Sequence, residues 1–145
     1  MTPKMATLWL KIAIETQLLL GAAMILVGAP IIGGALSSLL GLVIDPGGEA
    51  APLTVEARLL AVIGGGLLIG WSALAWHITT TQVEAGDPRG ARALTIALLL
   101  WFGTDSLGSV VAGVPLNALG NLVYLALFLP PLIALMRNRR APLAA

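Results

Sequence analysis

The residues best suited to chemistry lie in an apolar stretch in the last third of the chain. Asp105 is followed one helical turn later by Ser109, and Asn117 and Asn121 come after the sequence 113–116, Gly-Val-Pro-Leu. At helical spacing Asp105 and Ser109 share one face, and the two asparagines share another. A short turn makes the two helices antiparallel neighbours. We therefore expect the four polar side chains to converge.

An ionised aspartate in a bilayer costs about 3 kcal/mol or more, so Asp105 must face the bundle, find partners or be protonated. Arg58 is the natural partner, because it is the one basic residue expected on the outer side of the membrane. Two interpretations stay open: a small polar site open to the outer leaflet, or a polar knot that fixes helix pairing. Interhelical polar contacts contribute only about 0.6 kcal/mol on average, which makes stability alone a weak reason for such a residue.

A second polar group is expected toward the other side of the membrane. Lys11 and Glu15 are four residues apart in the first apolar segment, and they share a helical face as a possible ion pair. His77 is predicted at a similar depth, pointing into a packed interface. The group is either a set of structural contacts or one part of a proton relay.

The composition excludes most soluble classes. Of 145 residues, 58% are hydrophobic and 10% charged, against about 25% charged in soluble domains. The chain has no cysteine and one histidine, which argues against thiolate chemistry, disulfides and histidine-rich metal or haem sites, and we expect no cofactor. A net charge of +1 gives no reason to expect a nucleic-acid partner. The lipid bilayer is the expected environment.

The hydropathy pattern predicts an all-α integral membrane four-helix bundle that forms a single domain over 1–145. The predicted spans are about 7–28, 56–82, 90–112 and 116–136. Thr54 and Asp87 are the expected N-caps of two of them. The segment 31–44 is amphipathic and too short to span, so we expect an interfacial or re-entrant segment on the outer side.

Small residues predict where helix backbones approach one another. Gly66 and Gly70 form a small-xxx-small motif, which we expect to pack against a helix of the same bundle or of a partner. Gly108 and Gly120 lie within the polar stretch and are expected to let the backbones of its two helices approach.

The basic residues predict the orientation. Four spans place all but one of the eight basic residues on the side of the two termini, and only Arg58 lies on the other side. By the positive-inside rule, both termini are expected in the cytoplasm, with the protein in the inner (plasma) membrane.

The plan of four spans, an amphipathic outer segment after the first helix and a polar final hairpin resembles small bacterial DoxX-like membrane proteins and related four-helix families. The resemblance covers most of the chain but only its architecture. No catalytic motif of those families matches the sequence 101–109, Trp-Phe-Gly-Thr-Asp-Ser-Leu-Gly-Ser. No functional residue is therefore carried over.

Three functions are compatible with these patterns. The first is a non-enzymatic subunit whose partner is another membrane protein or, in a homo-oligomer, a further copy of the same chain. The second is a small proton-coupled transporter that uses Asp105 on one side and Glu15 with His77 on the other. The third is a membrane enzyme acting on a lipid or quinone, which the scarcity of histidines and acids disfavours.

Overall fold

The computed structural model describes residues 1–29, 34 and 53–137, and this part of the chain consists of helices and turns. The elements are α1 (Pro3–Val27), α3 (Val55–Ile78) with its π-helical extension η1 (Thr79–Val83), α4 (Pro88–Val111) and α5 (Pro115–Arg137). Four helical segments are long and apolar enough to cross a membrane, as predicted. The predicted segment 31–44 lies outside the described residues, apart from residue 34.

Local sequence signals explain where these helices begin and turn. The predicted N-caps are confirmed: Thr54 Oγ1 accepts a hydrogen bond from the Ala57 N–H at 3.2 Å, and Asp87 Oδ1 accepts one from the Arg89 N–H at 2.9 Å. The turn before α5 contains Gly113, whose φ of +80° suits a residue without Cβ. This tight turn makes α4 and α5 an antiparallel hairpin.

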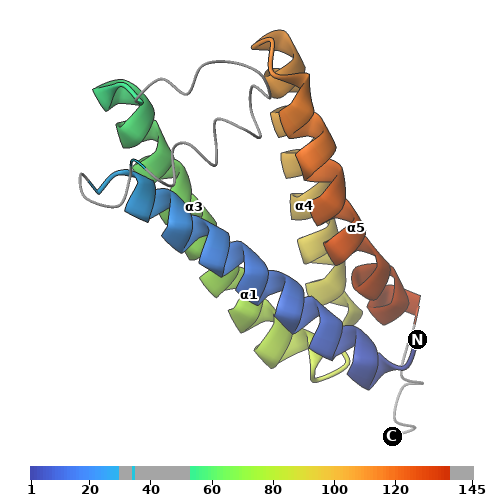
Figure 1. The fold of residues 1–145 in the computed structure, drawn as a ribbon. Coiled ribbons are helices and arrows are strands. Elements are labelled where there is room, and N and C mark those ends of the chain that lie inside the picture. The colour runs from blue at the N-terminus through green and yellow to red at the C-terminus, as the bar shows by residue number, and fades with distance from the viewer. Residues whose placement is uncertain (30–33, 35–52, 138–145) are drawn as a thin grey trace, which may run out of the picture.

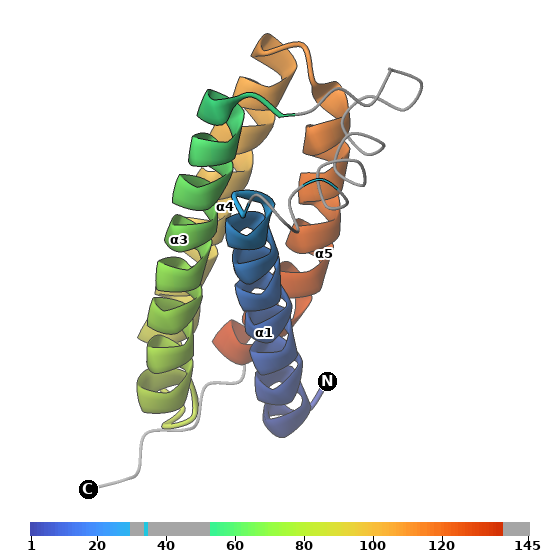
Figure 2. The same cartoon turned by 60° about the vertical axis from the view of Figure 1, so that its left-hand side comes forward.

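The helices form two pairs that meet at one end of the molecule. Helix α1 packs most extensively against α3, and α4 against α5, while α1 also contacts α5. In Figure 1 the pairs lie close together at the end that contains the N-terminus and diverge toward the α4–α5 turn, and in the view of Figure 2 α1 is drawn between α3 and α5. We call the first the closed end and the second the open end.

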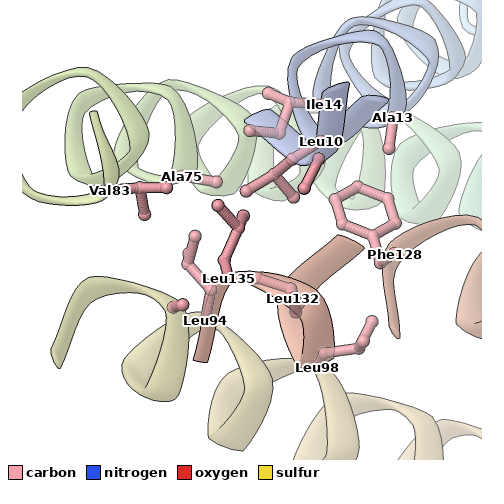
Figure 3. Close-up of a cluster of buried hydrophobic side chains, with 12 residues drawn as sticks. Leu10, Ala13, Ile14, Ala75, Val83, Leu94, Leu98, Phe128, Leu132 and Leu135 are labelled. Carbon is pink, nitrogen blue, oxygen red and sulfur yellow. The ribbon is translucent and has the colours of Figure 1, made fainter. Parts of the chain in front are cut away.

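The hydrophobic core lies in the closed end. Leu10, Phe128 and Leu132 are almost fully buried, and they come from α1 and α5. Smaller contributions come from α3, η1 and α4, so that all the helices meet around one cluster (Figure 3). The full set of buried apolar residues in this cluster is Ala6, Leu10, Ala13, Ile14, Ala75, Val83, Ala91, Leu94, Leu98, Phe128, Leu132 and Leu135.

Helices α1 and α3 approach closely at a pair of glycines that the sequence analysis did not single out. A Cβ added at Gly65 would lie 2.5 Å from the Gly21 carbonyl oxygen, and one at Gly21 would lie 2.8 Å from the Gly65 carbonyl oxygen. Only a residue without a side chain fits at either position. The backbones therefore touch here, as small residues permit in membrane helices.

The prediction that Gly66 and Gly70 pack against another helix of the same bundle is wrong for the described residues. A Cβ added at either glycine meets no atom of these residues within 4 Å. The physical reason is a rotation of α3 by one position: its buried residues are Gly65, Ser72 and Ala75. Packing of the Gly66/Gly70 face against a separate protein stays a prediction.

Gly108 and Gly120 also differ from expectation. A Cβ added at either glycine meets no atom of the described residues within 4 Å, so neither glycine marks a close approach of α4 and α5. At the open end, α4 and α5 contact each other through polar side chains and not through glycines.

Candidate functional site: a polar cavity toward the open end

Asp105 on α4 is held by two amide groups from α5. The Asn121 Nδ2 group donates to Asp105 Oδ2 at 2.6 Å, and the Asn117 Nδ2 group donates to the same oxygen at 3.0 Å. The asparagines are four residues apart, so one face of α5 presents both. The hairpin thus fixes the carboxylate from a single side.

Two serines complete this network. Ser109 Oγ donates to the Asp105 backbone carbonyl at 2.7 Å and accepts from Asn117 Nδ2 at 2.8 Å. Asn121 Nδ2 also donates to Ser106 Oγ at 3.2 Å. The structure therefore brings together the four residues that the sequence predicted to converge and adds Ser106.

Arg58 does not join the network, and the prediction that it partners Asp105 is wrong. Within the described part of the chain, Arg58 makes no ion pair. Its position near the start of α3 explains this, because α3 pairs with α1 and the two helix pairs diverge at the open end (Figure 1). The carboxylate is held by amides instead of a guanidinium.

A cavity of about 550 Å³ lies beside this network, and all four helices line it. This volume falls within the roughly 300–1,000 Å³ typical of small-molecule sites. The polar lining consists of Gln17, Asp105, Asn117 and Asn121, and the aromatic lining consists of Trp71, Trp101 and Tyr124. The remaining lining is apolar apart from two glycines.

Gln17 is the polar residue of the described cavity lining that the sequence analysis missed. Its side chain is buried, with 6% exposed, yet its Oε1 atom has no hydrogen-bond partner among the described residues. A buried polar atom without a partner typically costs about 1–3 kcal/mol. The signal was available in the sequence, since Gln17 is an uncharged polar residue far from either end of an apolar span.

The aromatic side chains of the cavity lining pack against other aromatic rings, one of which belongs to the hydrophobic core. Trp71 packs edge-to-face on Phe128 with 5.9 Å between ring centroids, and Trp101 packs similarly on Tyr124 at 6.3 Å. Such pairs contribute about 0.5–1.5 kcal/mol beyond their burial. The rings are thus positioned by contacts within α3–α5 and α4–α5.

The predicted second polar group at Lys11, Glu15 and His77 does not assemble. Lys11 Nζ binds Glu84 Oε1 at 2.6 Å and lies 5.1 Å from the centroid of the Trp76 ring. Glu15 is exposed, and in the described part of the chain it makes no ion pair with Lys11. Glu84 replaces it, because the turn after η1 brings that carboxylate next to α1.

His77 is exposed as well, so its predicted place in a packed interface is wrong. The same rotation of α3 that exposes Gly70 turns His77 away from the neighbouring helices, while Ala75 and Thr79 are buried. Among the described residues, no group of three metal-binding side chains occurs. The cavity is thus the one described place where several predicted polar residues meet.

The DoxX-like resemblance stays a prediction. The chain matches no protein-family model, no curated protein and no solved structure.

Proposed function

We propose that the protein is a non-enzymatic multi-pass membrane protein whose cavity binds a lipophilic molecule from the bilayer. One observation carries the proposal: Gln17, whose buried Oε1 atom has no hydrogen-bond partner among the described residues, lines the same cavity as the Asp105 network. A bound molecule with a polar head would satisfy Gln17, and its apolar chain would contact the surrounding side chains.

A purely structural role, in which polar side chains fix the pairing of α4 and α5, explains only part of the cavity lining. It accounts for Asp105, Asn117 and Asn121, whose side chains hydrogen-bond across the α4–α5 contact. It does not account for Gln17, which lies on α1 and bonds to none of them. Because uncompensated polar groups are costly in an apolar environment, a ligand partner gives Gln17 a physical role.

The geometry supports binding more than catalysis or proton transport. The hydroxyl proton of Ser109 is directed at a helix carbonyl, so Asp105 does not activate that oxygen as a nucleophile. Glu15 and His77, the proposed inner members of a relay, do not line the cavity. Among the described lining residues, the transport proposal therefore lacks a second acidic or histidine side chain beside Asp105.

The orientation proposed from the sequence fits the distribution of charge. The closed end and its neighbouring turns carry the described basic residues Lys4, Lys11, Arg89, Arg92 and Arg137, whereas Arg58 lies near the opposite end. We therefore place the closed end in the cytoplasm and the cavity in the outer half of the inner (plasma) membrane.

Cysteine labelling tests this orientation, since the natural chain has no cysteine. Ala112→Cys at the α4–α5 turn and Ala85→Cys at the α3–α4 turn are both exposed sites. An impermeant thiol reagent applied to intact cells should label Cys at 112 and spare Cys at 85. The reverse pattern would place the cavity on the cytoplasmic side.

Ligand binding is tested with dodecyl compounds that carry a terminal bromine, which quenches nearby tryptophans. Trp71 and Trp101 line the cavity. In phosphatidylcholine nanodiscs, at least one compound of a series with different head groups should quench in a saturable manner. Quenching that rises only in proportion to the compound dissolved in the lipid, for every head group, would contradict the proposal.

A matched pair of variants localises the binding. Gly120 lines the cavity, Gly108 does not, and both have open space at the Cβ position. Gly120→Leu should fill part of the cavity and abolish saturable quenching, whereas Gly108→Leu should keep it. Equal thermal stability of the two variants would show that the loss arises from filled volume.

Lateral association with another membrane protein is the second candidate. The observation that favours it is the exposed Gly66/Gly70 face of α3, where a further helix has room to approach. Gly70→Leu should then reduce the size of the complex extracted in mild detergent. An unchanged complex would assign this face to lipid.

A further inference from the structure

We infer that the molecule bound in the cavity carries a primary ammonium group on an alkyl chain. The inference rests on the proposed function and specifies its ligand class. It follows from the sign of the charge in the cavity, from the hydrogen-bonding groups left unused there, and from the aromatic rings around them.

The cavity has one formal charge. Asp105 is the only acidic residue among its described lining residues, and none of these residues is Lys or Arg. Arg58, the nearest expected counter-ion by sequence, makes no ion pair in the described part of the chain. A carboxylate in a site of low dielectric favours a cationic ligand and repels an anionic one.

The hydrogen-bond network leaves acceptors unused. A carboxylate accepts hydrogen bonds, so each asparagine must direct its Nδ2 group, not its oxygen, at Asp105. Asn117 Nδ2 is shared between Asp105 and Ser109, and Asn121 Nδ2 between Asp105 and Ser106. Both amide groups have thus committed their N–H donors, while their carbonyl oxygens keep their accepting capacity.

Gln17 adds an acceptor from the opposite helix pair. Gln17 lines the cavity, and its buried Oε1 atom has no partner in the part of the chain that the structure describes. A primary ammonium has three N–H donors, enough to reach a carboxylate oxygen and amide oxygens at once. A hydroxyl head has one donor, and a quaternary ammonium has none, so both would leave acceptors unsatisfied.

The rest of the lining suits such a molecule. Trp71, Trp101 and Tyr124 line the same cavity as the polar groups, and aromatic faces attract cations within about 6 Å. Leu20, Met24 and Leu67 provide apolar contacts for an alkyl chain. An aminophospholipid fits less well, because its phosphate would bring a negative charge toward Asp105.

The test compares four brominated dodecyl compounds in phosphatidylcholine nanodiscs, with amine, trimethylammonium, alcohol and carboxylate heads. Concentrations are expressed as mole fraction in the lipid, so that differences in partitioning cancel. The amine should saturate the quenching of the cavity tryptophans at a roughly tenfold lower mole fraction than the alcohol, the scale of a charge-assisted hydrogen bond. The carboxylate should bind most weakly.

Asp105→Asn separates charge from shape. It removes the negative charge and keeps the size of the side chain, so the advantage of the amine should fall roughly tenfold while alcohol binding changes little. An unchanged preference for the amine in this variant would overturn the role of Asp105.

Each remaining outcome has a separate meaning. Alcohol, trimethylammonium or carboxylate binding as tight as amine binding would overturn the inferred ligand class and leave a lipophilic site intact. Displacement of the amine by phosphatidylethanolamine added to the nanodiscs would assign the ammonium to a phospholipid and overturn the choice of a free amine. Absence of saturable quenching with every head group would refute the proposed function itself.

Discussion

The closed and open ends of the bundle are built from the same four apolar helices of the described chain, yet they are held together differently. At the closed end, large side chains such as Leu10, Phe128 and Leu132 interlock between the two helix pairs. Toward the open end the contacts lie within each pair. Helices α1 and α3 touch at Gly21 and Gly65, and α4 and α5 are joined by hydrogen bonds between polar side chains. Apolar composition alone therefore does not bring the two pairs together along their whole length, and interlocking side chains join them at the closed end.

The consequence is a division of roles. Packing at the closed end fixes the two pairs relative to each other, and the space between them farther along becomes the cavity. Substitutions at the closed end should change stability, whereas substitutions around the cavity should change ligand binding more than stability. The predictions below test this division.

The largest effect is expected at Phe128. This side chain is 2% exposed and packs edge-to-face on Trp71. Phe128→Ala should lower the free energy of unfolding by about 3 kcal/mol, because it leaves a void among buried side chains. Leu119→Ala, at a residue that is 59% exposed near the open end, should change it by less than about 0.5 kcal/mol. Reversible unfolding in mixed micelles measures both, and equal effects would contradict the division.

A smaller loss is expected at the glycine contact of α1 and α3. Gly65→Ala places a methyl group against the Gly21 backbone and should cost about 1–3 kcal/mol, since neither backbone can move without displacing its helix. The neighbouring Gly66→Ala is the control, because its Cβ meets open space in the described structure. If both variants unfold at the same denaturant concentration, the contact is not as close as described.

The polar network should contribute less to stability than either packing site. Asp105→Leu removes the acceptor of Asn117 and Asn121 and should destabilise the protein by about 1–2 kcal/mol. Asp105→Asn keeps hydrogen-bonding capacity and should be milder. A loss as large as that of Phe128→Ala would mean that the network is primarily structural.

The smallest effect is expected at Asp87, the exposed N-cap of α4. The side chain and backbone N–H of Arg89 lower the pKa of Asp87 below its ordinary value of 3.8. Its ionised form therefore stabilises the fold above that pH, and this contribution is lost as the pH falls through the lowered pKa. Wild type and Asp87→Asn, which keeps a capping oxygen, should converge in stability toward acidic pH. A stability difference that does not change with pH would show that charge is irrelevant at this cap.

The sequence predicted those features that depend on spacing within a helix or across a short turn. Asp105, Ser109, Asn117 and Asn121 lie within 17 residues of one another around a tight turn, so their convergence followed from helical geometry. The four helices followed equally from hydropathy, and the caps at Thr54 and Asp87 from their residue types.

The predictions that were wrong concern features that depend on which helices pair and on how each helix is rotated about its axis. Three consecutive glycines, 64–66, make the packing face of α3 ambiguous by one position, and only the partner Gly21 selects Gly65. The same ambiguity misplaced His77. Arg58 was predicted to partner Asp105 only because both residues were expected toward the same side of the membrane. That expectation carries no information on which helices pair.

The central claim is that the molecule binds between the helix pairs and not simply in the surrounding lipid. Two single-tryptophan proteins test it most directly: one keeps Trp101 in the cavity wall, the other keeps Trp9 on α1, and the remaining three tryptophans in each are replaced by phenylalanine. With the brominated dodecylamine in nanodiscs, Trp101 fluorescence should fall along a saturable curve, whereas Trp9 fluorescence should fall in proportion to the compound dissolved in the lipid. Identical quenching curves for the two proteins would contradict the account.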